Sequence, residues 1–150
     1  MLTYERGDII TGNYPIFCHQ VNCKGVMGSG IARAIKAKYP EAYESYVELC
    51  KFIKPLGTAQ AVKLNDGRVC INLFGQDRYG RDKRYTDYTA FKHCLVDLEL
   101  ILSKYPNDTV VAFPYAIGCG LAGGDWNIIQ GMIKDFSEKI NQKVVIVSLK

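Results

Sequence analysis

Glycine-rich turns are the feature of this sequence whose residue types most directly suggest chemistry. The stretch GVMGSG, residues 25–30, places three glycines within six residues, immediately before a helix-like pattern. A tight turn needs one or two glycines, so three indicate that something other than the chain approaches this backbone. A glycine turn at a helix N-terminus presents unpaired N–H groups and the positive end of the helix dipole, which together bind phosphate oxygens.

The same arrangement occurs a second time, around residues 118–124. FCHQVNCKGVMGSGIARAI and VVAFPYAIGCGLAGGDWNII each read as an apolar strand, a glycine turn and a helix. Ligands of open α/β sheets bind at the carboxyl ends of strands, so two such turns facing each other would clamp a diphosphate. The alternative is two purely structural turns. Neither turn is a Walker A motif or a dinucleotide-binding GxGxxG, because the required residues and spacing are absent. We call residues 25–30 the first glycine loop and residues 118–124 the second glycine loop.

The elements that position these loops follow from the hydrophobic pattern. Strands are expected within 2–10, 14–22, 58–64, 68–74, 109–118 and 143–149. Helical spacing covers residues 31–39, 42–50, 91–105 and 126–140, with Pro40 separating the first two helices. The sequence Asn-Asp-Gly between the third and fourth strands predicts a hairpin. Strands that alternate with helices predict a mixed sheet covered by helices on both faces.

Length and composition set the broad class. The chain has 150 residues, which predicts one domain spanning 1–150, and its 48% hydrophobic and 23% charged residues are typical of a globular protein. No apolar run approaches the length of a membrane span, and the N-terminal residues lack the features of a signal peptide, so we expect a cytoplasmic protein with no membrane partner. The formal net charge of +4 favours an anionic ligand.

The cysteines and histidines do not indicate a metal site. The two histidines, His19 and His93, are far apart in the sequence, and no CxxC pair is present. We therefore expect no metal and no cofactor. Reduced cysteines that pack as small apolar side chains are favoured over a disulfide framework, because most of the six lie in apolar runs. The six are Cys18, Cys23, Cys50, Cys70, Cys94 and Cys119.

Four short motifs, taken together, resemble a known family. They are GDI at 7–9, VN at 21–22, MGSGIA at 27–32 and GCGL at 118–121. The set resembles the macrodomain family, whose members bind ADP-ribose, and the likeness extends over nearly the whole chain. The branch that it resembles contains ADP-ribosyl glycohydrolases and ADP-ribose 1''-phosphate phosphatases. The resemblance implies an α/β fold of three layers, α/β/α, with a mixed central sheet.

The resemblance also implies a set of ADP-ribose contacts. Asp8, with the backbone of Ile9 beside it, would accept a hydrogen bond from the adenine amino group, and Asn22 would bind the distal ribose; both could instead be turn residues. The two glycine loops would wrap the diphosphate, and the end of the last strand would lie near the adenine. The residues implied for these last contacts are Met27, Gly28, Ser29, Gly30, Ile31, Gly118, Cys119, Gly120, Leu121, Ser148 and Leu149.

Catalytic residues of the family do not carry over directly. Ala32 and Ala122 stand where two branches of the family have an aspartate, and Gln76 lies near the position of a catalytic lysine, so a lysine–sugar intermediate is not expected. His19 matches a histidine of the phosphatase-like pattern, although it could be a core histidine of a strand. Asp125 is the second catalytic candidate, and the alternative is that it caps the helix beginning at Trp126.

A long connection follows the fourth strand. The sequence GQDRYGRDKRYTD, residues 75–87, mixes four basic residues with tyrosines and contains the polar candidates Asp77 and Lys83. Its length favours a lid that covers the ribose or meets the modified target, and the alternative is a solvated charged loop. We call residues 75–87 the basic loop.

Three functions remain open from the sequence. The leading hypothesis is an enzyme that removes ADP-ribose from modified protein or nucleic acid. The second is a non-catalytic reader of ADP-ribose, and the third is an ADP-ribose 1''-phosphate phosphatase. Each predicts ADP-ribose or an ADP-ribosylated macromolecule as the partner, with nucleic acid bound only as a modified substrate.

Overall fold

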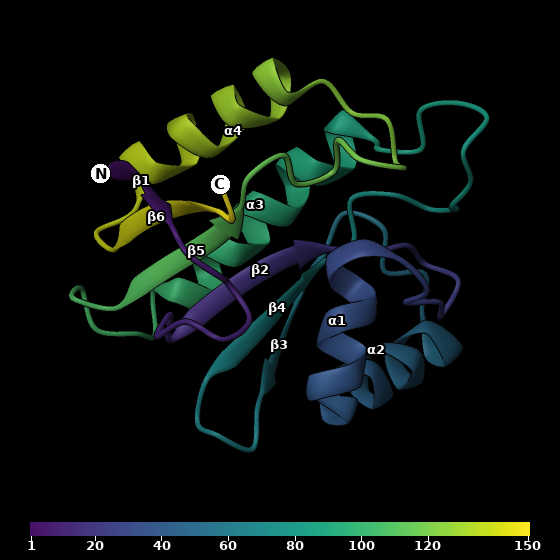
Figure 1. Cartoon of the computed structure of the whole chain (residues 1–150), viewed down its shortest axis with the longest axis horizontal. Coiled ribbons are helices and arrows are strands. Elements are labelled where there is room, and N and C mark those ends of the chain that lie inside the picture. Colours follow the sequence, from purple (N-terminus) through teal and green to yellow (C-terminus); the bar gives the residue numbers. More distant parts are fainter.

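The computed structural model describes all 150 residues and contains one six-stranded sheet and four helices (Figure 1). The strand order is β1-β6-β5-β2-β4-β3, and all neighbouring strands run parallel except β3 and β4. The elements are β1 (Leu2–Arg6), β2 (Ile16–Gln20), α1 (Gly30–Lys38), α2 (Pro40–Phe52), β3 (Ala59–Lys63), β4 (Val69–Leu73), α3 (Tyr88–Leu102), β5 (Val110–Pro114), α4 (Trp126–Lys139) and β6 (Lys143–Ser148). The mixed sheet that the sequence predicts is confirmed.

The predicted hairpin joins the two antiparallel strands. β3 and β4 pair with Val62 opposite Cys70, and the turn between them places Gly67 at a φ of 91°. Only glycine adopts this left-handed backbone without strain, which explains the Asn-Asp-Gly signal.

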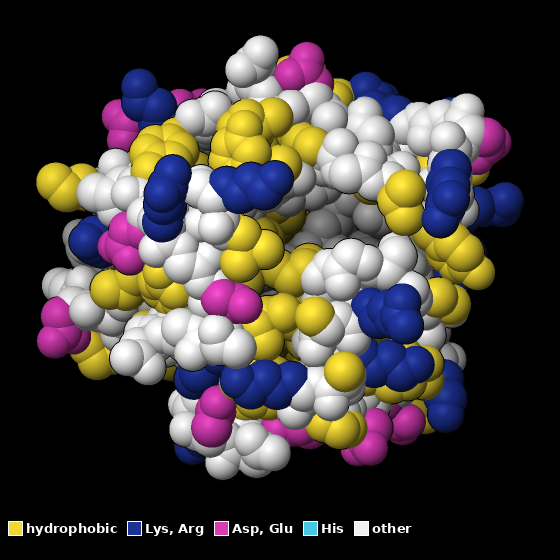
Figure 2. All heavy atoms as spheres, viewed as in Figure 1, with side chains coloured by type: hydrophobic (Ala, Val, Ile, Leu, Met, Phe, Trp, Pro, Cys, Tyr) yellow, Lys and Arg dark blue, Asp and Glu magenta, His cyan; other side chains and the backbone are white.

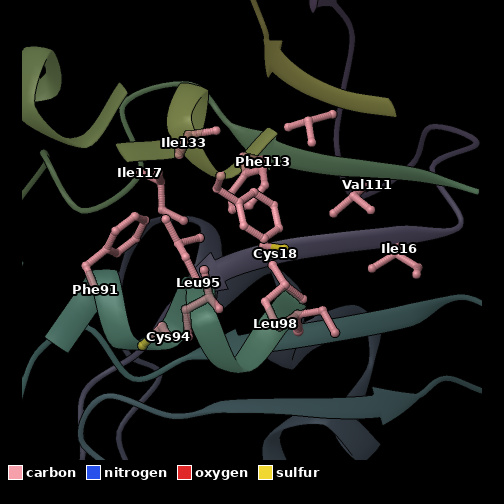
Figure 3. Close-up of a cluster of buried hydrophobic side chains, with 14 of the residues drawn as sticks. Ile16, Cys18, Phe91, Cys94, Leu95, Leu98, Val111, Phe113, Ile117 and Ile133 are labelled. Atoms are coloured by element: carbon pink, nitrogen blue, oxygen red, sulfur yellow. The ribbon is translucent and has the colours of Figure 1, made fainter. Parts of the chain in front are cut away.

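The helices cover both faces of the sheet. α1 and α2 pack on one face, where alternate strand residues such as Phe17 and Cys70 meet Ile35 and Tyr39. α3 and α4 pack on the other face, and Figure 3 shows the larger core there, with Cys18 and Phe113 of the strands facing Leu95, Leu98 and Ile133 of the helices. This two-sided burial explains the continuously apolar strands and confirms the three-layer α/β/α fold.

The helix ends follow the local sequence. α1 stops before Pro40, which occupies the first turn of α2, as predicted. The apolar stripe that predicted a third helix reaching Tyr105 is too long, because α3 ends at Leu102 and Tyr105 lies in a turn whose N–H bonds to Leu102 O. α3 is also the longest helix, at 15 residues, and no helix has the length and apolar composition needed to cross a bilayer.

The parallel strands create one edge where the functional loops gather. β1, β6, β5, β2 and β4 all point their carboxyl ends to the same edge, so the segments that follow them lie together. The first glycine loop follows β2, the basic loop follows β4, and the second glycine loop follows β5. Since α1 and α4 cover opposite faces, the two glycine loops reach this edge from its two sides.

Candidate functional site

A cavity of about 1260 Å³ opens at the carboxyl edge of the sheet. Figure 2 shows the hollow in this face of the molecule, with apolar and uncharged atoms on its walls and Lys and Arg side chains around it. Both glycine loops line the same cavity, together with residues that follow β1, β4 and β6. A concave site of this size, with few charged groups in its wall, is typical of small-molecule binding.

Most of the residues implied by the resemblance lie on this wall. Only Met27 and Cys119 of that set do not. Those in the wall are Asp8, Ile9, Asn22, Gly28, Ser29, Gly30, Ile31, Gly118, Gly120, Leu121, Ser148 and Leu149. These residues come from four segments that are far apart in the sequence, and they meet at one cavity.

Met27 and Cys119 point away from the cavity for physical reasons. Met27 is 2% exposed and packs with Val21, Tyr46 and Phe74 in a small apolar cluster beneath the first glycine loop. Cys119 turns its thiol toward Ile117 O, 3.3 Å away. Met27 is thus buried beneath the first loop, whereas Cys119 is half-buried and its thiol bonds to the backbone of the second loop's own strand connection.

The first glycine loop leaves backbone N–H groups free at an open helix end. Ser29, the residue before α1, makes no side-chain capping hydrogen bond. The N–H groups of Gly28 and Ser29 also donate to no protein acceptor. A Cβ at Gly30 would meet nothing within 4 Å, although its φ of 58° favours glycine. This loop therefore offers an anion free N–H groups and the positive end of a helix dipole.

A tyrosine hydroxyl holds the first glycine loop from below. Tyr46 Oη of α2 accepts hydrogen bonds from the N–H groups of Gly25 and Val26, both 3.1 Å long. It donates toward the main-chain oxygen of Asn22 at 2.8 Å and Asn22 Oδ1 at 2.6 Å. Burial raises the pKa of Tyr46 well above its usual value, so the hydroxyl stays protonated and serves as donor and acceptor.

The Asn22 amide is largely committed to the loop itself. Its Oδ1 accepts from Lys24 N and Tyr46 Oη, and its Nδ2 donates to Val26 O at 2.8 Å. One N–H of the amide remains without a protein acceptor. Asn22 thus shapes the turn, as one sequence interpretation held, and keeps a single donor for a ligand.

The second glycine loop presents free amides without an open helix end. The N–H groups of Gly120, Leu121 and Ala122 donate to no protein acceptor, and a Cβ at Gly120 would meet nothing within 4 Å. The N-terminus of α4 is closed, because the Asp125 carboxylate accepts from Asn127 N at 2.9 Å. The prediction that this loop would use a helix N-terminus is therefore wrong, and the backbone of the loop itself provides the donors.

The two catalytic candidates lie outside the cavity wall. Asp125 is the N-cap of α4, the alternative that the sequence left open. His19 is fully buried on β2, with Nε2 2.5 Å from Asn72 Oδ1 and Nδ1 without a partner. Burial lowers the pKa of His19 to about 4, so the ring is neutral near pH 7. Neither side chain lines the surface that a bound sugar would touch.

The end of the cavity at β1 is held by an arginine of the hairpin. Asp8 Oδ1 accepts from Ile10 N at 2.8 Å, a local turn that leaves its other carboxylate oxygen free. Arg68 donates to the main-chain oxygens of Ile9 at 2.7 Å and Tyr14 at 2.8 Å, and also to Ile10 O. The hairpin thereby fixes the segment that carries Asp8 and Ile9.

The basic loop forms the opposite end of the cavity. Tyr79, Gly80 and Arg81 line the wall, whereas Asp77 and Lys83 do not. Tyr85 N and Thr86 N both donate to Ala122 O, at 2.8 and 3.1 Å, so this loop is tied to the second glycine loop. The wall contact favours the lid interpretation.

Sequence reasoning missed other wall residues. Gln20 ends β2 and Tyr115 follows β5, and both line the cavity. A polar or aromatic residue at the carboxyl end of a parallel strand was the signal that could have identified them. Ala32, Gln76 and Ala122, which the resemblance places at or near catalytic positions of related branches, also line the wall.

The charges of the wall favour an anion. The charged side chains that line it are Asp8, at one end, and the basic residues Arg81 and Lys150. No histidine or cysteine lines it. Together with the free amides of both loops, this gives the centre of the cavity a positive potential.

Comparisons with known proteins agree with this architecture. The family model of the Macro domain matches residues 18–133. The macrodomain of Mycobacterium tuberculosis DarG has a TM-score of 0.86 and 26% identity, with 99% of this chain and 97% of that chain covered. An ADP-ribose 1''-phosphate phosphatase of Meyerozyma guilliermondii is 32% identical, with 96% of this chain and 98% of that protein covered.

A further relative is longer than this chain. A DNA ADP-ribosyl glycohydrolase of Mycobacterium tuberculosis is 30% identical over 97% of this chain, and the match covers 42% of that protein. The chain thus spans less than half the length of that relative. The family model, the fold and the two-loop cavity all agree, and the chain belongs to the macrodomain family.

Proposed function

We propose that this chain binds ADP-ribose in the cavity, with the diphosphate between the two glycine loops. One observation carries the proposal: free backbone amides of Gly28, Ser29, Gly120, Leu121 and Ala122 reach the same cavity from two sides. Bare amides in glycine turns are suited to phosphate oxygens, because no side chain keeps the anion at a distance.

The length of the cavity edge supports an extended nucleotide sugar. From β1 to β4 there are four strand spacings of about 4.8 Å, so the edge is about 19 Å long. The adenine would lie beside Asp8, Ile9 and Ser148, where the free oxygen of the Asp8 carboxylate accepts from the amino group. The distal ribose would then lie near Asn22 and Gln76.

We propose further that the chain hydrolyses ADP-ribosyl linkages. The relatives named for glycohydrolase and phosphatase activities support a hydrolytic role. The distal part of the wall holds the amides of Asn22 and Gln76, each with one N–H free of protein acceptors. These donors would orient the ribose or a water molecule, while the adjacent diphosphate would favour an oxocarbenium-like transition state.

A non-catalytic reader is the second candidate, and one observation favours it. Asp8 is the only carboxylate in the wall and lies at the opposite end from Gln76, so the distal end holds no general base. Phosphatase activity has less support from the residues, because the buried His19 does not reach the cavity. The proposed partner is ADP-ribose on a protein or nucleic acid, and we propose a cytoplasmic location and a single domain over 1–150.

Calorimetry followed by a turnover panel tests these proposals in order. Titration with ADP-ribose should give saturable binding, and absence of binding would overturn the whole proposal. The protein is then incubated with ADP-ribosylated protein, ADP-ribosylated DNA and ADP-ribose 1''-phosphate. Release of ADP-ribose supports the hydrolase, release of phosphate supports the phosphatase, and binding without any product supports the reader.

A further inference from the structure

The end of β2 carries a side chain that joins three loops. Gln20 lines the cavity, and its Nε2 donates to Gln76 Oε1 at 2.8 Å and to Thr86 Oγ1 at 2.9 Å. Gln76 and Thr86 lie at the two ends of the basic loop, where they also form an isolated β-bridge. Gln20 therefore ties the sheet to both ends of the basic loop at once.

The remaining bonds of the two partners extend this network in defined directions. Thr86 Oγ1 donates to Gly118 O of the second glycine loop at 2.6 Å. Gln76 Nε2 donates to Arg78 O within the basic loop at 2.8 Å. These bonds assign every donor and acceptor consistently, with the Gln20 Nε2 donating to both partners. One amide group thus connects β2 to the second glycine loop and to the segment that carries the basic wall residues.

Packing around the amide explains two glycines. A Cβ at Gly118 would lie 3.0 Å from Gln20 Oε1, and a Cβ at Gly75 would lie closer still to the same atom. The amide therefore fills the space that side chains at both positions would need. Gly118 is a glycine because of Gln20 as well as its φ of 75°, whereas Gly120 faces open space.

The same amide has an oxygen that stability alone does not explain. Gln20 Oε1 is buried and has no hydrogen-bond partner. A buried unpaired acceptor costs free energy, and an apolar side chain of the same shape would avoid this cost. The Gln20 Nε2 thus makes two favourable hydrogen bonds, while its Oε1 lowers stability. A residue that shapes the site would be kept despite this loss of stability.

We propose that Gln20 is a positioning residue that sets the spacing between the second glycine loop and the basic loop. Through Thr86 and Gln76 it shapes the end of the cavity where the distal ribose is proposed to lie. The part of the inference that concerns ligand affinity rests on the proposed ADP-ribose site. The part that concerns loop geometry does not, and it is measured without ligand.

Amide hydrogen exchange of the free protein tests the loop geometry. Gln20→Met keeps the length of the side chain and removes both the donor and the unpaired oxygen. The amides of Tyr85 and Thr86, which bond across the two loops to Ala122 O, should exchange at least about fivefold faster, while core amides of β4 stay protected. Unchanged exchange of the loop amides, or equal acceleration throughout the sheet, would overturn the proposal.

Affinity for two ligands tests the effect on the site. Gln20→Met should weaken ADP-ribose binding at least about fivefold and change AMP binding less than about twofold, because AMP lacks the distal ribose. Equal losses for both ligands, or no loss for either, would overturn the role in the distal end. If the wild-type protein binds neither ligand, the proposed function fails, and the exchange result alone decides the role of Gln20.

A second variant guards against misfolding. Thr86→Val removes the hydroxyl with little change in shape. It breaks both the hydrogen bond from Gln20 Nε2 and the hydrogen bond to Gly118 O. The double variant should weaken ADP-ribose binding by less than the product of the two single effects, since both changes remove one connection. Independent, multiplying effects would contradict a shared network, and Thr86→Val alone supplies both readouts if Gln20→Met does not fold.

Discussion

The two glycine loops reach the same cavity but provide their amides in different ways. The first loop leads into α1, whose N-terminus is open because Ser29 makes no capping bond. The second loop leads into α4, whose N-terminus is closed by Asp125. The first loop can therefore add a helix dipole to its free amides, whereas the second depends on the conformation of its own backbone.

The two loops are also held in place by different parts of the structure. Tyr46 holds the first loop from α2 through a buried hydroxyl. The second loop is held by its neighbours at the edge, through Thr86 and the bonds to Ala122 O. The comparison suggests a rigid first loop and a second loop whose position depends on the basic loop.

Blocking the second loop should give the largest effect. Gly120→Glu adds a carboxylate where a Cβ meets nothing, so the side chain fits without strain and projects into the cavity. Negative charge beside the proposed diphosphate should reduce ADP-ribose affinity at least about 100-fold. Calorimetry measures the affinity, and thermal unfolding should show little change in stability. Gly120→Ala is the matched control and should lose far less affinity; full binding by Gly120→Glu would place the anion elsewhere.

Lowering the pH should protonate a buried group on β2, the strand that leads into the first loop, but none on β5, the strand that leads into the second. β2 carries the buried His19, whereas β5 is apolar throughout. The folded protein keeps His19 neutral until about pH 4, while the unfolded chain takes up a proton near pH 6.5. The free energy of unfolding should therefore fall by up to about 3 kcal/mol as pH falls from about 6.5 to 4.

A histidine variant separates this contribution from the rest of the titration. His19→Gln keeps a donor for Asn72 Oδ1 and should flatten the pH dependence of urea unfolding between those values. His93→Gln, at the exposed histidine of α3, is the matched control for the loss of one histidine. If the free energy of unfolding depends on pH equally in His19→Gln and in the wild type, His19 is not the source of the pH dependence.

Removing the support of the first loop should cost both stability and affinity. Tyr46→Phe leaves the N–H groups of Gly25 and Val26 without an acceptor and should lower the free energy of unfolding by about 2–3 kcal/mol. Denaturant unfolding measures the loss, and ADP-ribose affinity should fall with it. Tyr43→Phe removes a single 3.2 Å bond to Gly25 O and should cost less than about 1 kcal/mol. Equal costs would contradict the central role of Tyr46.

The smallest expected changes in stability concern the N-termini of α1 and α4. Asp125→Ala removes a cap and should destabilise the protein by about 1 kcal/mol, whereas Ser29→Ala should change stability by less than about 0.5 kcal/mol. Thermal unfolding compares the two. Asp125→Asn keeps a capping oxygen, so unchanged turnover in this variant is expected, and a strong loss of turnover would restore the catalytic hypothesis for Asp125.

The sequence predicted the frame of the site better than its details. Strand–turn–helix order placed both loops at one edge, because that arrangement depends only on parallel strands and their connections. The roles of single glycines could not be predicted. Gly118 accommodates Gln20 and Gly124 lies against Gly118 O, whereas Gly120 faces the cavity, and only the packing distinguishes them.

Side-chain direction was the other limit. Met27 belongs to a motif that implies ligand contact, yet its side chain fills the apolar cluster under the loop. Gln20 lies between His19 and the VN motif but was part of neither signal, because its hydrogen-bond partners are 56 and 66 residues away. The histidine of β2 was an equally open case, because strand alternation does not say whether a polar side chain will find a buried partner such as Asn72.

Titration of the isotope-labelled protein with ADP-ribose, followed by backbone amide NMR, tests the central claim most directly. The amide resonances of Gly28, Gly30 and Gly120 should shift together and saturate at one concentration of ligand. Those of Gly67 and Gly131, in the hairpin turn and in α4, should remain in place. Shifts confined to one glycine loop, or centred on the small pocket between α3 and α4, would contradict a diphosphate held between the two loops.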